Sequence, residues 1–274
     1  MSMFTKLFLF VSSAIAIVLL ACTQPTPPTN IDNAPTKMAV SAPAPINNAA
    51  PQDTVGRNYL MGKIDPTTDK RFAKIAAKYR NAEESYMRIE AYESFQKMYE
   101  AALKDGVTLR IISATRPFNK QKAIWEAKWT GKKLVDGAYL KGEPKVPSER
   151  ALQIMRWSSM PGTSRHHWGT DVDLNELNNP YFDKGTGLKI YTWLKEHASE
   201  YGFCQVYSVK GAERPDGYQE ERWHWSYTPL SKGFTEEYAG LITDKDISGF
   251  IGSESAVEIG AVKKYVLGIS KECQ

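Results

Sequence analysis

The chain has 274 residues, with 35 lysines and arginines against 31 aspartates and glutamates, and a formal net charge of +4. This mild charge is spread along the chain without a basic run, so the sequence gives no reason to expect a nucleic-acid partner. The 7 tryptophans and 14 tyrosines fit an aromatic-lined cleft, although packing in a core explains most of them. No internal repeat is visible, which disfavours a repeat architecture.

Residues 1–21 are typical of an export signal and are set apart from the fold. Lys6 gives a small positive start, and the apolar run at 7–20 is shorter than the roughly 20 residues of a membrane-spanning helix. The run ends in Leu-Leu-Ala-Cys at 19–22, which resembles the bacterial lipoprotein cleavage box. We therefore expect Cys22 to carry a lipid that anchors the protein to a membrane. The alternative is an ordinary secretory signal followed by a chance cysteine.

Residues 22–53 are rich in Pro, Ala, Asn and Thr and contain almost no large apolar side chain, which predicts a flexible tether. Thr23 replaces the aspartate that retains lipoproteins at the inner membrane in enterobacteria-like systems, so the outer membrane is favoured if the cell is Gram-negative. The sequence thus predicts an exported lipoprotein on the periplasmic side. The remaining residues, 54–274, are enough for one working domain with a substantial core, which we expect to be monomeric.

Short strands alternate with helices along this domain. Helices are expected at 69–104 in two pieces broken near 80–81, after Pro117, at 147–157 and at 188–201. Strands are expected at 107–113, 169–174, 203–209 and 222–227, where β-branched or aromatic residues alternate with polar ones. This order predicts an α+β fold in which a small antiparallel sheet is flanked by helices.

The first chemically suggestive segment runs Ser-Arg-His-His-Trp-Gly-Thr-Asp-Val-Asp over 164–173. On a helix, His166 and Asp173 would lie about 10.5 Å apart along the axis, too far to share one ion. A turn near Gly169 that leads into a strand would instead let His166 fold back over Asp173. Asp171 shares a strand face with Asp173 and is a rival ligand, and a polar loop with a capping aspartate is the plain alternative.

The second segment is Glu-Arg-Trp-His at 221–224. Two imidazoles and a carboxylate hold a catalytic zinc ion while leaving a position for water, and Glu221 stands close enough in sequence to take a proton from that water. In a regular strand Glu221 and His224 would face opposite sides, so this reading requires the strand to begin at or after Trp223, or to bulge there. The alternative is a sheet edge that holds a hydrogen-bonded histidine. His167 is expected to stand behind a ligand or to line the cleft, and His197 needs no functional role.

Taken together, Ser-x-His-x-x-Gly-x-x-x-Asp and Glu-x-Trp-His resemble the motifs of the VanY-like zinc D-alanyl-D-alanine carboxypeptidases, a group shared with lysostaphin-type peptidases and hedgehog signalling domains. The resemblance implies that His166, Asp173 and His224 bind one zinc ion and that Glu221 is the general base. The resemblance also favours Asp173 over Asp171 as the carboxylate ligand.

A third element, Ser-Ala-Thr-Arg at 113–116 followed by Gln121, is similar to a Ser-Gly-Tyr-Arg turn of the same family. The resemblance assigns Arg116 to stabilising the oxyanion or gripping the substrate carboxylate. Gln121 and Ser164 become hydrogen-bonding residues of the substrate cleft. The chain departs from the family pattern at Ala114, at Thr115 and at Asp171, where a small residue is common, and these departures leave the chemistry in place while putting fine substrate preference in doubt.

The resemblance implies hydrolysis of a peptide bond near the C-terminus of a peptidoglycan stem peptide, most simply release of the last D-alanine. Within the same chemistry, an L,D-carboxypeptidase acting on tetrapeptide stems and an endopeptidase that cuts cross-links are alternatives. A zinc-bearing binding module is the alternative from another class, and the presence of Glu221 argues against it. In an exported protein Cys204 and Cys273 can pair, with two buried thiols as the alternative, and the tail after about Thr243 can pack on the domain or cover the cleft.

Overall fold

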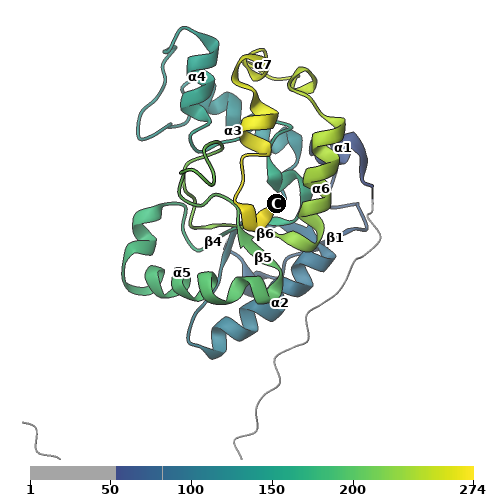
Figure 1. The fold of residues 1–274 in the computed structure, drawn as a ribbon, viewed down its shortest axis with the longest axis vertical. Helices are drawn as coiled ribbons and strands as arrows, with labels where there is room; N and C mark the ends of the chain where they lie inside the picture. The colour runs from purple at the N-terminus through teal and green to yellow at the C-terminus, as the bar shows by residue number, and fades with distance from the viewer. Residues whose placement is uncertain (1–53, 82) are drawn as a thin grey trace, which may run out of the picture. The chain divides into compact units, whose positions relative to one another are not determined.

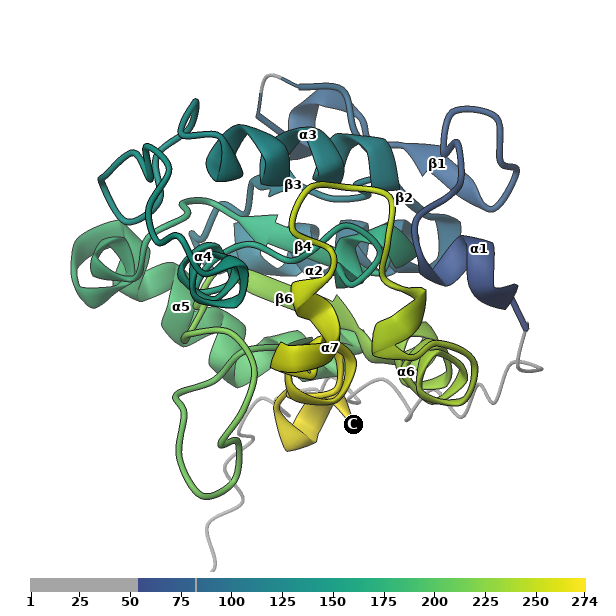
Figure 2. The same cartoon turned by 90° about the horizontal axis from the view of Figure 1, so that it is seen from above.

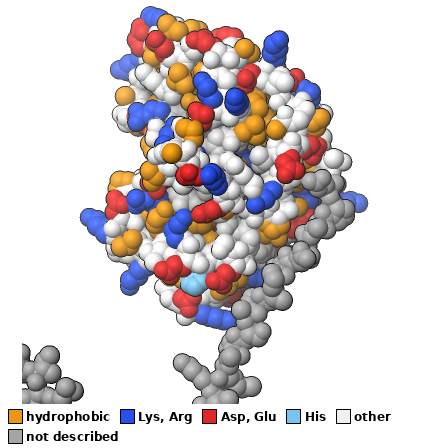
Figure 3. Space-filling view, in the orientation of Figure 1, with side chains coloured by type: hydrophobic (Ala, Val, Ile, Leu, Met, Phe, Trp, Pro, Cys, Tyr) orange, Lys and Arg blue, Asp and Glu red, His pale blue; other side chains and the backbone are white. Residues whose placement is uncertain are grey.

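The computed structural model describes residues 54–81 and 83–274, which form the α+β arrangement expected from the sequence (Figure 1). The expected signal peptide at 1–21, the tether at 22–53 and the lipidation site Cys22 lie outside the described residues. Among the described residues, no helix has both the length and the apolar character needed to cross a membrane. Basic and acidic side chains are interspersed over the face seen in Figure 3.

A four-stranded antiparallel sheet lies at the centre, in the order β3-β4-β6-β5. Its strands are β3 (Ile111–Ser113), β4 (Asp171–Leu174), β5 (Phe203–Gln205) and β6 (His224–Tyr227). Neighbouring positions of a strand point to opposite faces, so Val172 and Leu174 face one side of the sheet and Asp171 and Asp173 face the other. The sheet therefore has one apolar and one polar central face.

The apolar face is covered by α2 (Ile89–Lys104) and α5 (Gly185–His197), which run below the sheet in Figure 1. Phe95 from α2, Trp193 from α5 and Val172 from β4 belong to one buried cluster. Gly106, just after α2, has φ +74 and ends that helix as the sequence predicts. This layer fixes the sheet from one side only.

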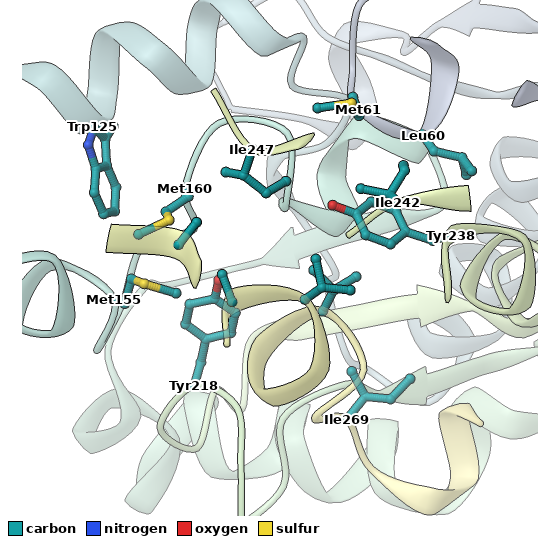
Figure 4. Packing of buried hydrophobic residues seen from close by; sticks show 14 of the residues in the cluster. Leu60, Met61, Trp125, Met155, Met160, Tyr218, Tyr238, Ile242, Ile247 and Ile269 are labelled. Atoms are coloured by element: carbon teal, nitrogen blue, oxygen red, sulfur yellow. The ribbon is translucent and has the colours of Figure 1, made fainter. Parts of the chain in front are cut away.

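A second buried cluster lies on the other side of the molecule. The helices that contribute to it are α1 (Gly56–Leu60), α3 (Phe118–Trp129), α4 (Pro147–Ile154), α6 (Thr228–Leu241) and α7 (Ser255–Ile259). Figure 2 shows these helices around the sheet from above, and Figure 4 shows side chains of the cluster that come from separate segments, among them Trp125, Met160 and Tyr238. The polar face of the sheet, which carries Asp171 and Asp173, thus lies between two cores.

The C-terminal segment packs on the domain, which answers the question that the sequence left open. Ile247, Val262 and Ile269 are buried in the second cluster, and no residue after 243 lines the main cleft among the described residues. Cys273 is joined to Cys204 by a disulfide with Cα atoms 5.7 Å apart. The end of the chain is therefore fastened to β5 at the sheet edge.

The expected helix over 69–80 is wrong. The segment forms β1 (Phe72–Lys74), which pairs with β2 (Tyr86–Arg88), and a 3-10 turn at Ala77–Tyr79. The helical spacing was coincidental because its apolar residues serve different cores: Phe72 enters the second cluster, whereas Ile75 and Tyr79 enter the first. The hairpin then supplies the backbone partners that a helix would have supplied internally, such as the bond from Ile75 N to Ser85 O of 2.9 Å.

The other elements are found near their expected places, and the strands are shorter. The expected strand at 107–113 is regular only over β3, and those at 203–209 and 222–227 shrink to β5 and β6. Short 3-10 helices cover Arg165–Trp168, Asn179–Asp183, Ala198–Tyr201, Asp244–Asp246 and Lys271–Cys273, and a π-helical turn covers Val262–Val266.

Gly169 offers a test of this architecture because two of its properties can be separated. Its φ is +75, and a Cβ there would lie 2.4 Å from the Phe72 ring and 3.1 Å from Arg88 N. We expect Gly169→Ala to lower the free energy of unfolding well beyond the roughly 1–2 kcal/mol left-handed penalty, as measured by denaturant titration. Gly106→Ala is the control, since Gly106 has φ +74 and open space around the same position. Equal losses in the two variants would show that the close packing at Gly169 is unimportant.

Candidate metal centre and cleft

Three side chains capable of binding a metal meet on the polar face of the sheet. His166, Asp173 and His224 each offer a ligand atom, and these atoms lie within 4.8 Å of one another. We call these three residues the metal-type cluster. Asp173 and His224 are direct cross-strand partners in the β4–β6 pairing, so the backbone register itself brings them together. The structure thus brings together the three residues that the sequence proposed as ligands, and all three are buried.

His166 reaches the cluster from the 3-10 turn Arg165–Trp168, which Gly169 ends in the left-handed conformation before β4 begins. Its Nδ1 donates to Ala114 O over 3.0 Å, and its Nε2 lies 3.3 Å from Asp173 Oδ2. The backbone bond therefore fixes the ring and its tautomer, leaving Nε2 free to bind a metal.

His224 is oriented from the opposite side of its ring. Its Nε2 lies 2.9 Å from Asp171 Oδ2, and its Nδ1 lies 2.9 Å from Glu221 Oε2 and 3.8 Å from Asp173 Oδ1. Asp171 therefore stands behind the imidazole rather than beside the other ligands. This geometry separates the two aspartates that spacing alone left as rivals.

The electrostatics of the cluster fit a divalent cation. Asp173 Oδ1 is buried and has no hydrogen-bond partner among the described residues, as expected of an oxygen that is available to bind a metal ion. Burial would by itself lower the pKa of His224, but its bonds to Asp171 and Glu221 outweigh burial and raise that pKa to about 10. The carboxylates around His224 thus favour a positive charge at this point, and two imidazoles with one carboxylate form a donor set typical of zinc.

β6 begins at His224, so Glu221 lies before the strand. The two side chains are therefore not forced to opposite faces by a regular strand, as the sequence-based interpretation requires. The Glu221 backbone N donates to Tyr207 O over 2.9 Å, and its carboxylate faces the His224 ring. Burial raises the pKa of Glu221, against the opposing effect of the His224 bond. A carboxyl group whose pKa is moved toward neutrality is better suited to accept and return a proton.

Arg116 reaches the same cleft from the segment after β3. Its guanidinium lies 3.5 Å from Asp173 Oδ2 and donates to Gln121 Oε1 over 2.8 Å and to Ser113 Oγ over 3.2 Å. Gln121 in turn donates to Ser159 O over 2.6 Å and is fully buried, so its role in the structure is to hold Arg116 and the 159 loop.

Ser164 and His167 lie away from the cleft lining. Ser164 is buried, and its Oγ has no hydrogen-bond partner in the part of the chain that the structure describes. His167 accepts a bond from Gly162 N through Nε2 and donates to Arg116 O through Nδ1, and burial lowers its pKa to about 3. His167 is therefore a neutral brace between two loops, whereas His197 is partly exposed and contacts Glu200.

The cluster opens into a cleft of about 730 Å³. One wall comes from α3, where Lys120, Ile124 and Lys128 repeat every four residues on one face. Sequence reasoning found Gln121 on this helix but missed Lys128, although the four-residue spacing was visible. The facing surfaces carry Trp157, Trp223 and Tyr207, and the ring of Tyr207 meets His224 edge to face at 5.0 Å.

Sequence reasoning also missed the buried charge pair behind the ligands. Arg165 Nε lies 3.2 Å from Asp171 Oδ2, and both side chains are fully buried. Thr170 Oγ1 and Ser226 Oγ donate to the other oxygen of Asp171, and the Arg165 guanidinium stacks over Trp168 with a separation of 4.4 Å. The nearby Arg165 charge keeps the pKa of Asp171 below its usual range although burial opposes this, so Asp171 stays ionised.

Removing Asp171 should therefore destabilise the protein strongly. Asp171→Ala leaves the Arg165 charge buried without its partner, which typically costs about 3–5 kcal/mol of unfolding free energy. Asp183→Ala breaks a largely exposed pair with Arg222 and should cost about 1 kcal/mol or less. Chemical denaturation of both variants measures the difference. A loss at Asp171 no larger than at Asp183 would refute the importance of the buried pair.

Comparison with known proteins identifies the family of this chain. Residues 84–230, more than half of the chain, match the model of the VanY family, described as D-alanyl-D-alanine carboxypeptidase. A D-alanyl-D-alanine carboxypeptidase of Enterococcus faecalis is 29% identical over 165 residues, covering 60% of this chain and 56% of the relative. The putative carboxypeptidase YodJ of Bacillus subtilis is 28% identical over 169 residues, covering 60% and 52%. The chain thus spans little more than half the length of these relatives.

Among solved structures, the chain is similar to VanYB in complex with D-alanine-D-alanine, with 25% identity, a TM-score of 0.44, and coverage of 61% of this chain and 88% of that one. It is also similar to the LD-carboxypeptidase LdcB, with 25% identity, a TM-score of 0.46, and coverage of 63% and 75%. The matched range contains the positions of Arg116, His166, Asp173, Glu221 and His224. The chain belongs to the VanY family of D-alanyl-D-alanine carboxypeptidases.

Proposed function

We propose that this protein is a zinc-dependent carboxypeptidase that releases the C-terminal D-alanine from peptidoglycan stem peptides ending in D-Ala-D-Ala. The observation that carries the proposal is the buried cluster of His166, Asp173 and His224 with Glu221 beside it, open to a cleft. A module that only binds a metal has no need of a buried carboxylate next to the ligands. The names of both sequence relatives support the carboxypeptidase class, and the name of the Enterococcus faecalis relative supports the D-Ala-D-Ala substrate.

His166, Asp173 and His224 would hold the zinc ion, because they provide the borderline nitrogen and oxygen donors that this metal accepts. When bound, the ion supplies Lewis-acid chemistry: it polarises the scissile carbonyl and lowers the pKa of a coordinated water. The bonds from His166 to Ala114 O and from His224 to Asp171 keep both rings in place during the reaction.

The chain's own residues then carry the proton and the charge. Glu221 accepts the proton of the attacking water and returns it to the leaving amine, and its raised pKa suits both steps. Arg116 stands 3.5 Å from Oδ2 of the ligand residue Asp173, so its guanidinium is placed to stabilise the oxyanion that develops on the carbonyl. Gln121 and Ser113 hold that guanidinium from behind.

We also propose that the domain works on the periplasmic side of a membrane, anchored through a lipid on Cys22. This proposal rests on the lipoprotein-like box at 19–22 and on the tether-like composition of 22–53. Such a tether would let the domain reach cell-wall stems while it remains attached to a membrane.

The assignment of Glu221 is tested by Glu221→Gln, which keeps the shape of the side chain and removes its basicity. We expect kcat to fall by about 10²–10⁴-fold. The variant should still bind one zinc ion per chain, as measured by atomic absorption. Glu220→Gln is the matched control, since Glu220 pairs with Arg222 and does not line the cleft. Activity of Glu221→Gln within tenfold of wild type would refute the base role, and loss of zinc would show that Glu221 is needed for metal binding, directly or through His224.

The substrate is tested by incubating the zinc-loaded protein with defined pentapeptide stems, tetrapeptide stems and cross-linked dimers, with products weighed by mass spectrometry. We expect loss of one D-alanine from the pentapeptide alone, because the terminal D-Ala-D-Ala bond is the proposed target. Cleavage confined to tetrapeptides or cross-links would replace this specificity with another within the family. Cleavage of none of them would contradict the enzymatic proposal.

A further inference from the structure

Lys128 is a cation in the wall of the cleft, and the described residues provide no counter-ion for it. Its Nζ donates to Ser158 Oγ, and no carboxylate of the described residues lies within 4.0 Å of it. The side chain is partly buried between α3 and the loop at 157–159. Holding an ammonium group in such a place without a negative partner is unfavourable, so the position needs an explanation.

The other cations of the cleft differ from Lys128. Lys120, on the same face of α3, pairs with Glu83 over 3.1 Å and is exposed. Arg116 is held by Gln121 and Ser113 beside the metal-type cluster, and Lys133 is exposed to solvent. Among the described cations that line this cleft, Lys128 is thus the partly buried one with no carboxylate within 4.0 Å, since Arg116 lies 3.5 Å from Asp173.

The charges around Lys128 also indicate that this part of the cleft attracts an anion. Burial lowers the pKa of Lys128 to about 8, and the neighbouring charges of Lys133 and Arg116 act in the same direction, whereas Asp136 and Glu221 oppose them. The group therefore remains largely protonated at neutral pH. An anion that enters the cleft would be attracted by Lys128, Lys133 and Arg116 together.

We propose that Lys128 and Ser158 form a carboxylate-binding subsite that selects peptide substrates carrying a free carboxylate. The inference rests on the proposed function, because a peptide that enters this cleft brings such groups. An ammonium and a hydroxyl side by side provide charge-assisted and neutral donors for the two oxygens of one carboxylate. The carboxylate has two possible sources: the C-terminal group of the residue to be released, or an internal one on a glutamate of the stem.

The subsite assigns separate tasks to the two cations. Arg116 lies against Asp173 and acts where charge develops on the carbonyl, whereas Lys128 acts on a charge that the substrate carries throughout. An interaction present equally in the bound substrate and in the transition state affects KM and leaves kcat nearly unchanged. This difference gives the subsite a kinetic signature of its own.

The test compares wild type, Lys128→Met and Lys132→Met on three pentapeptides: the free acid, its C-terminal amide, and a form whose internal glutamate is amidated. For the free acid, Lys128→Met should raise KM by about ten- to hundredfold with kcat within twofold of wild type. Lys132→Met should leave both nearly unchanged, because Lys132 is exposed and does not line the cleft. The increase in KM should vanish on the one peptide in which the carboxylate bound by Lys128 is amidated. That peptide identifies which carboxylate of the substrate the subsite binds. An equal rise on all three peptides, or none, would overturn the subsite.

Two further measurements keep the test decisive if Lys128→Met folds poorly or if no peptide is cleaved. Wild type itself should bind the relevant amide about ten- to hundredfold more weakly than the free acid, as measured by calorimetry with D-Ala-D-Ala-terminated peptides. Lys128→Arg, which keeps the charge, should retain part of the preference. Binding that is indifferent to amidation would refute the subsite, whereas absent hydrolysis with selective binding would refute the proposed reaction alone.

Discussion

The antiparallel pairing of β4 with β6 is the constraint on which the site depends. In this register Asp173 lies opposite His224 and Asp171 lies opposite Ser226, so the polar sides of two short strands form a single surface. A shift by one residue would turn Asp173 into the apolar layer and bring Val172 to the metal-type cluster. Burial of Val172 and Leu174 against α2 and α5 makes that shift costly. The core on one face thus fixes the chemistry on the other.

The same polar face carries a fully buried ion pair, which a protein could replace by apolar packing with little loss of stability. Here Asp171 does two things at once, because one oxygen contacts both Arg165 and His224 while the other accepts from Thr170 and Ser226. An apolar replacement would leave the His224 ring free to turn and its Nε2 without a partner. The charged network is therefore best explained as a means of fixing the orientation of His224, with Arg165 keeping Asp171 ionised in a buried place.

Much of the site could be predicted from the sequence because its groups lie in two short segments with diagnostic residue types. The ligands, Glu221 and the need for strand irregularity before His224 all follow from those segments. The function of Asp171 could not be predicted, since it depends on Arg165 approaching from the preceding 3-10 turn and on Ser226 lying opposite on β6. The hairpin of β1 and β2 was missed for a related reason: its apolar residues are shared between two cores, and spacing along one segment cannot show which core each side chain enters. The spacing of Lys120, Ile124 and Lys128 indicates a shared helix face, but it cannot show that Ser158 of the loop at 157–159 lies against Lys128.

The C-terminal segment links the two sides of the cleft. Trp125 Nε1 donates to Ile251 O over 2.8 Å and Lys122 Nζ donates to Gly249 O over 2.6 Å, so this segment holds α3 from outside. Farther on, Ser270 Oγ bonds to Val206 O over 2.9 Å, and Cys273 is joined to Cys204 of β5. Since β5 pairs with β6, which carries His224, the segment fastens the helix that bears Lys128 to the sheet that bears the ligands. Residues whose role the sequence left open therefore help to hold the proposed carboxylate subsite and the metal-type cluster in place, and a substrate must span the distance between the two.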